Sequence, residues 1–187
     1  CMQKPFKRHP EFDKMLASIL HKDRYGRLLL HDSDNYEIAT IVKNRLMNQN
    51  IDMNRVHFIP CQPHNKLMGL YSLSDVILDS YYAGGCTTTR EALELGTPVV
   101  TLPGKYLGSR WSLAYYSIMN VYDMIAKNKE DYVNLCVKIA INKTYRGILK
   151  NKILSNIHKL FYQKEAVESW SNLIESIIQN KIELFKQ

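Results

Sequence analysis

The sequence alternates short, wholly apolar segments with segments of helical apolar spacing, and no other feature limits the possible folds as much. The apolar runs of strand length are 27–31, 56–59, 75–79 and 98–102. A helical segment at 11–20 precedes the first run, and the helical segments between the runs are 39–46, 66–73 and about 88–95. Strands that are apolar on both faces and joined by single helices imply a parallel sheet covered on both sides. We therefore expect an α/β fold with a doubly wound, Rossmann-like parallel sheet.

Beyond Leu107 the spacing stays helical to the end of the chain. One apolar stripe contains Tyr132, Leu135, Cys136 and Ile139, and a second stripe contains residues 167, 170, 174, 177 and 178. A chain of 187 residues without linkers or repeats predicts one domain over 1–187, with a helical tail over about 125–187. Because Cys1-Met2-Gln3 is more typical of a strand end than of a free terminus, we expect a fragment of a longer protein.

Composition and charge restrict the partners. No apolar stretch reaches the ~18 residues of a membrane span, and the N-terminus lacks the order of a signal peptide. Four cysteines without C-x-x-C spacing favour reduced thiols and a cytoplasmic location. The net charge of +7 favours an anionic partner, but the basic residues accompany no nucleic-acid-binding motif. We expect neither a membrane nor a nucleic acid as partner.

The segment from Asp79 to Glu91 leads from a predicted strand into a predicted helix. In open parallel sheets, ligands bind at this kind of passage. Gly84 and Gly85 permit positive φ and close approach of a ligand, and the threonines that follow place hydroxyl and N–H groups at the first helical turn. A phosphate fits this geometry. An ordinary capping box, Thr88-x-x-Glu91, explains part of the same pattern.

The segment also belongs to a longer run with a family resemblance. The run is DVILDSYYAGGCTTTREALELGTPVVTLPGKYLGSR, residues 75–110, and it resembles the C-terminal catalytic half of the O-GlcNAc transferase family, especially its bacterial and SPINDLY-type members. The resemblance continues through VHFIPCQPH, CMQKPFKRHPEFD and MIAKNKEDY, so that it covers nearly all of the chain. It implies the C-terminal half of a two-Rossmann (GT-B) glycosyltransferase, which binds a nucleotide-diphosphate sugar.

By position, the resemblance assigns diphosphate binding to Thr87 and Thr88 and ribose binding to Glu91. Lys7 falls on the lysine that neutralises the leaving diphosphate, and Gln3 lies near a glutamine of the same loop. A cation in this place stabilises the negative charge that develops as the nucleotide departs. The expected donor site further includes Gly85, Cys86 and His64.

Two positions depart from the family pattern. Cys86 stands where the animal enzymes carry a histidine, and Leu67 stands where they carry the histidine that packs on uracil. His64 lies near a base-contacting lysine of the family, although a histidine in a Pro-His-Asn turn also fits an exposed role. A UDP-sugar is the favoured donor, and guanosine or another base stays open.

Three groups of residues also allow other roles. Asp32-Ser33-Asp34 could hold a divalent cation, but a helix cap by Ser33 or Asp34 explains it more simply. Cys86 at a helix start could be a nucleophile, yet no G-x-C-x-G elbow accompanies it. Tyr81 and Tyr82 could line a sugar site or pack within their loop.

The resemblance therefore implies a metal-independent, inverting glycosyltransferase domain that needs no cofactor. It would bind a nucleotide-diphosphate sugar, stabilise the leaving group through Lys7, and serve transfer of a GlcNAc-like or other hexose to a protein or peptide. The resemblance places the general base and the acceptor surface in a missing N-terminal half. The alternative is a non-catalytic module that binds a nucleotide sugar or a diphosphate and regulates a partner.

Overall fold

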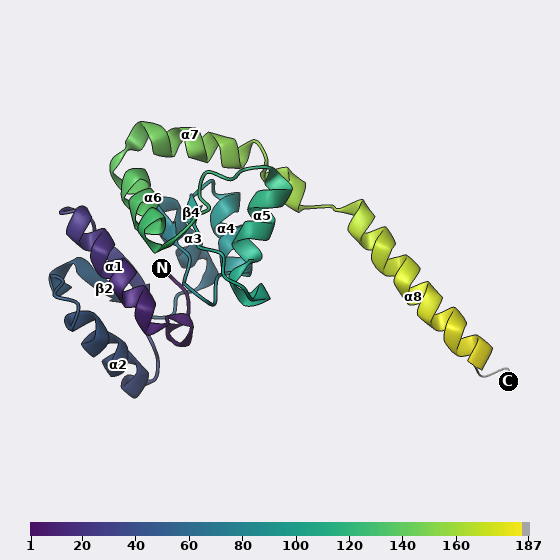
Figure 1. The fold of residues 1–187 in the computed structure, drawn as a ribbon, viewed down its shortest axis with the longest axis horizontal. Coiled ribbons are helices and arrows are strands. Elements are labelled where there is room, and N and C mark those ends of the chain that lie inside the picture. The colour runs from purple at the N-terminus through teal and green to yellow at the C-terminus, as the bar shows by residue number, and fades with distance from the viewer. Residues whose placement is uncertain (185–187) are drawn as a thin grey trace.

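The computed structural model describes residues 1–184, in which helices and short parallel strands alternate as the sequence predicts (Figure 1). The α-helices are α1 (Pro10–Lys22), α2 (Tyr36–Met47), α3 (His64–Leu73), α4 (Thr87–Glu94), α5 (Trp111–Met119), α6 (Lys129–Ile141), α7 (Lys143–Leu154) and α8 (Lys164–Leu184). The strands are β1 (Leu28–His31), β2 (Val56–Ile59), β3 (Ile77–Leu78) and β4 (Val99–Val100). Short 3-10 helices are η1 (Pro5–Lys7), η2 (Met53–Arg55), η3 (Leu107–Ser109) and η4 (Ile157–Leu160).

The strands pair in parallel, but within residues 1–184 they form two separate two-stranded sheets instead of one doubly wound sheet. β1 pairs with β2 from Leu28–Val56 to His31–Ile59, whereas β3 pairs with β4 over two residues each. The apolar run at 98–102 begins with Pro98 and is followed by Pro103, and proline has no N–H to donate to a strand ladder. The α/β alternation is therefore confirmed, and the continuous sheet is not.

One hydrophobic core joins the part of the chain that contains β1 and β2 to the part that contains β3 and β4. The helices α1 and α6 lie side by side between the two parts, and the N-terminus lies close to them (Figure 1). The ring of Phe12 on α1 meets the edge of the Tyr132 ring on α6, with 6.1 Å between the ring centroids. Both rings are completely buried. Of the predicted stripe, Tyr132, Cys136 and Ile139 are buried and Leu135 is half-buried.

Asparagine side chains cap three of the helices. The Oδ1 atoms of Asn35, Asn128 and Asn142 each accept the N–H three residues further on, at 2.9 to 3.0 Å. The expected cap by Ser33 or Asp34 is therefore wrong, because α2 begins at Tyr36 and Asn35 precedes it. After the C-terminal end of α4, Gly96 adopts the left-handed conformation with φ +73°, which ends the helix.

The last helix, α8, points away from the rest of the molecule (Figure 1). The predicted stripe is present on it, but Val167 and Trp170 are each 66% exposed and Ile174 is 52% exposed. This stripe therefore adds little to the core. Within residues 1–184, no helix combines the length and apolar character that crossing a bilayer requires.

Candidate functional site

A cavity of about 370 Å³ opens where β1 and β2 end and α4 begins. Its lining residues come from the N-terminal loop, the end of β1, the loop after β2, α3 and the start of α4. The lining residues are Met2, Gln3, Lys4, Lys7, His31, Cys61, Gln62, Leu67, Cys86, Thr87 and Thr88. Five of the eight predicted site residues are among them, so that segments distant in sequence converge as the resemblance implies.

The first turn of α4 presents unused backbone donors to this cavity. Cys86 precedes the helix and caps it with no side-chain hydrogen bond. Within the described part of the chain, the N–H groups of Cys86, Thr87 and Thr88 donate to no protein atom. Free amides and the positive end of the helix dipole together favour an anion.

The capping box expected at Thr88 and Glu91 is not formed. Thr88 Oγ1 instead accepts a hydrogen bond of 2.7 Å from Gln3 Nε2. The Glu91 carboxylate turns towards His64, with 3.7 Å between Oε1 and Nδ1. The two side chains that could have blocked the helix start are therefore directed elsewhere.

Lys7 joins the N-terminal loop to the loop before α4. Its Nζ donates to Gln3 Oε1 at 3.2 Å and to the Gly84 carbonyl at 3.1 Å. Gln3 thus receives a bond from Lys7 and donates one to Thr88, which forms a continuous chain from the cation to the helix start. This chain brings a positive charge to the amides that face the cavity.

Gly84 and Gly85 are needed for close packing rather than for positive φ, since Gly96 is the positive-φ glycine of the described residues. A Cβ on Gly84 would stand 2.9 Å from both carboxylate oxygens of Asp79. A Cβ on Gly85 would stand 2.6 Å from Gln3 Nε2 and 2.8 Å from Thr88 Oγ1. The two glycines therefore allow close approach of other protein atoms, and close approach of a ligand stays a prediction.

His64 and Glu91 meet one another at the edge of the site, although neither lines the cavity. His64 opens α3 and is exposed, while Leu67, one turn later, contributes to the cavity wall. The contact between His64 and Glu91 therefore joins the helix that carries Leu67 to the helix that carries Thr87 and Thr88.

Sequence reasoning did not identify Asp79, His31, Cys61 or Gln62. His31 and Asp79 stand at the carboxyl ends of β1 and β3, and Cys61 and Gln62 follow β2. The rule that ligands bind beyond the carboxyl ends of parallel strands could have found all four. Asp79 is buried below the glycines, where its Oδ1 accepts the Gly85 N–H at 2.7 Å.

A second cation lies behind the cavity wall. Arg8 is only 2% exposed and donates from Nη2 to the His31 carbonyl at 2.7 Å. Burial lowers the pKa of Arg8 to about 10, against the opposing charges of Asp13 and Asp32. It therefore stays charged at neutral pH and adds positive potential beside the site.

Asp32 and Cys86, to which two of the competing arrangements gave other roles, each contact protein groups. Asp32 Oδ1 accepts the Ser33 N–H at 2.9 Å, and no metal-binding group of three His, Cys, Asp or Glu residues occurs within residues 1–184. The Cys86 thiol contacts the Tyr115 hydroxyl at 3.2 Å. Burial and this contact raise the pKa of Tyr115 to about 12, so that it would activate a thiol poorly.

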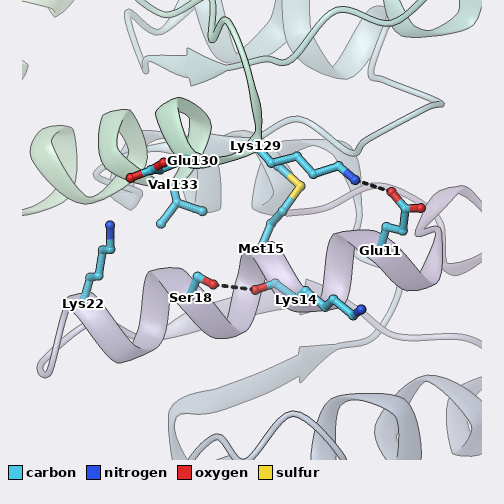
Figure 2. Close-up of a pocket in the computed structure, with 8 residues that line it drawn as sticks. All are labelled: Glu11, Lys14, Met15, Ser18, Lys22, Lys129, Glu130 and Val133. Carbon is cyan, nitrogen blue, oxygen red and sulfur yellow. Dashed lines mark hydrogen bonds and ion pairs between the residues drawn. The ribbon is translucent and has the colours of Figure 1, made fainter.

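A second cavity, between α1 and α6, shares no lining residue with the first (Figure 2). Three of its charged side chains have protein partners, because Lys129 pairs with Glu11 and Lys22 donates to Asn134 at 2.7 Å. The cavity at the start of α4 is therefore the better candidate for an anionic ligand.

Comparisons with known proteins agree with the resemblance. The sequence model of Glycosyl transferase family 41 matches residues 4–168. The chain is 33% identical over 91 residues to a UDP-N-acetylglucosamine--peptide N-acetylglucosaminyltransferase of Giardia intestinalis, covering 49% of the chain and 6% of that protein. It is 33% identical over 95 residues to a probable UDP-N-acetylglucosamine--peptide N-acetylglucosaminyltransferase SPINDLY of Arabidopsis thaliana, covering 50% and 10%.

Among solved structures, the K341M mutant of the Thermobaculum terrenum O-GlcNAc transferase matches with a TM-score of 0.85 and 21% identity. The match covers 97% of this chain and 36% of that one, which shows a shared fold. The chain thus spans a small part of its curated relatives and about a third of the solved structure. On the match over 4–168, the chain belongs to glycosyl transferase family 41, with the O-GlcNAc transferase and SPINDLY proteins.

Proposed function

We propose that this chain binds the nucleotide-diphosphate sugar of a protein glycosyltransferase. The observation that supports it best is the hydrogen-bonded chain from Lys7 through Gln3 to Thr88, beside free amides at the start of α4. The diphosphate would accept hydrogen bonds from these amides and from the Thr87 and Thr88 hydroxyls. The ribose would lie towards Glu91 and the base towards Leu67 and His64.

Lys7 would act on the leaving group. In transfer, an acceptor oxygen attacks the anomeric carbon from the face opposite the diphosphate, and the bond between that carbon and the β-phosphate oxygen breaks. The electron pair stays on the phosphate, so that negative charge grows close to Lys7 Nζ. Cation and helix amides together neutralise it without a metal. The attack inverts the anomeric carbon, and a base outside this chain takes the acceptor's proton.

The names of the relatives suggest the substrates. The Giardia and Arabidopsis proteins are named for UDP-N-acetylglucosamine as donor and a peptide as acceptor. We extend a UDP-sugar, GlcNAc-like or another hexose, and a protein acceptor to the protein that contains this chain.

Calorimetry with UDP, GDP and their sugars tests the donor site. We expect wild type to bind at least one nucleoside diphosphate, and Thr87→Ala/Thr88→Ala to bind it at least ~10-fold more weakly, because two hydroxyl donors are lost. Thr40→Ala, which removes a hydroxyl from the exposed face of α2, is the control. Equal binding by wild type and the double variant would reject the site. Sugar transfer to a peptide by the protein that contains this chain separates an enzyme from a non-catalytic module.

A further inference from the structure

Asp79 is a buried carboxylate to which the proposed chemistry gives no role. It follows β3 and is 3% exposed. Burial raises its pKa, although three hydrogen bonds and the charge of Lys7 oppose the shift. Carboxylates are seldom kept in such places unless the hydrogen bonds they accept are needed.

The Asp79 carboxylate connects three segments that surround the start of α4. Oδ1 accepts the Gly85 N–H at 2.7 Å. Oδ2 accepts the Thr101 hydroxyl, beyond β4, at 2.8 Å and the Ser112 hydroxyl, on α5, at 2.6 Å. The hydroxyls of Thr101 and Ser112 therefore fix the position of the carboxylate that accepts the Gly85 N–H.

The Gly85 carbonyl, which belongs to the next peptide group, is held by the same cluster. Thr89 Oγ1 donates to the Gly85 carbonyl at 3.1 Å and lies 3.2 Å from Ser112 Oγ. Thr89 and Ser112 are 2% and 1% exposed. Since the amides of Cys86, Thr87 and Thr88 follow directly, the orientation of Gly85 determines where these amides point.

We propose that Asp79 is the positioning residue of the anion site: by holding the Gly85 N–H, it directs the free amides of α4 into the cavity. The inference rests on the proposed function, because it concerns the same site. In this role Asp79 does not contact the ligand. Its hydrogen bond occupies the Gly85 N–H, which could otherwise donate to a phosphate. Its contribution is to fix the geometry of the remaining donors in advance.

Two buried threonines on either side of β4 provide a matched test. Thr101 is 1% exposed and donates to Asp79, whereas Thr97 is 4% exposed and donates to the Tyr71 carbonyl at 2.9 Å. Each loses one buried hydrogen bond on substitution by valine, so that both variants should lose similar stability. Only Thr101→Val disturbs the support of Asp79.

The experiment measures UDP and GDP binding by calorimetry together with thermal unfolding. We expect Thr101→Val to weaken the Kd by ~3- to 10-fold and Asp79→Ala by more than ~10-fold, while Thr97→Val stays near wild type. Asp79→Asn should bind within ~3-fold of wild type, because its carbonyl can accept from Gly85 and its amide can donate to the two hydroxyls.

Equal Kd values for Thr101→Val and Thr97→Val, or a folded Asp79→Ala that binds like wild type, would overturn the inference. If Asp79→Ala does not fold, Asp79→Asn and the threonine pair still decide. If wild type itself binds no nucleoside diphosphate, the proposed function fails and this inference fails with it. If wild type binds and the variants do not differ, only the role of Asp79 is rejected.

Discussion

Gln3 Nε2 and Thr88 Oγ1, which lie 85 positions apart in the sequence, are joined by a hydrogen bond of 2.7 Å. Through this bond the N-terminal loop, which carries Lys7, is attached to the helix that offers its amides. The proposed cation and the proposed anion donors therefore belong to one hydrogen-bonded unit. A substitution in the N-terminal loop should therefore change the geometry at the start of α4, and a substitution at the start of α4 should change the position of the loop.

Gly85→Ala tests how little space this unit has. The added Cβ would stand 2.6 Å from Gln3 Nε2 and 2.8 Å from Thr88 Oγ1, so that the Gln3–Thr88 bond must give way. We expect UDP binding at least ~10-fold weaker. Gly69→Ala on α3, where a Cβ meets nothing within 4 Å, is the control and should leave binding unchanged. Normal calorimetric binding by Gly85→Ala would contradict the described packing.

Lys7→Met tests the role of the cation. The change keeps the apolar stem and removes the charge that would face the phosphates, and charged hydrogen bonds contribute ~1.5 to 3 kcal/mol. We expect the Kd for UDP to rise by ~10- to 100-fold, with a smaller rise for UMP. Lys14→Met removes the same charge from the other cavity and should bind as wild type does. Equal losses in the two variants would indicate a general effect of net charge.

The sequence predicts the local elements well. Wholly apolar runs and helical spacing identify the helices and strands, since both patterns depend on residues near in sequence. The resemblance assigned Gln3, Lys7, Cys86, Thr87 and Thr88 to one site, and in the structure these five residues line one cavity. The strand pairing into two small sheets was not predicted, because it depends on distant contacts.

Side-chain partners were also beyond the reach of local patterns. Thr88 and Glu91 have the spacing of a capping box, but a distant Gln3 and a nearby His64 take these groups instead. The sequence pattern identified Asp79 only as the end of a predicted strand. The three groups that donate to its carboxylate lie 6, 22 and 33 positions away and leave no local pattern.

Alkylation of the thiols tests the location of the cavity. Cys61 is exposed and Cys86 half-buried, and both line the cavity, whereas Cys136 is buried. Burial raises the pKa of Cys136 well above its ordinary value, so that its thiol stays protonated and unreactive. With iodoacetamide we expect Cys61 to react first, Cys86 more slowly and Cys136 only after unfolding. Saturating UDP should slow the reaction of Cys86, as peptide mass spectrometry can follow. A rate at Cys86 that UDP does not change would place the ligand elsewhere.

The raised pKa of Asp79 predicts the pH dependence of stability. Between the ordinary aspartate pKa of about 3.9 and the higher folded value, the folded state holds a proton that the unfolded state has lost. The free energy of unfolding contributed by Asp79 therefore falls as pH rises through this window. Asp79→Asn cannot titrate, so that wild type should lose stability relative to this variant as pH rises. Urea unfolding of both proteins across the window measures the difference. A difference that grows in favour of wild type would mean that the bonds from Gly85, Thr101 and Ser112 outweigh burial and lower the pKa instead.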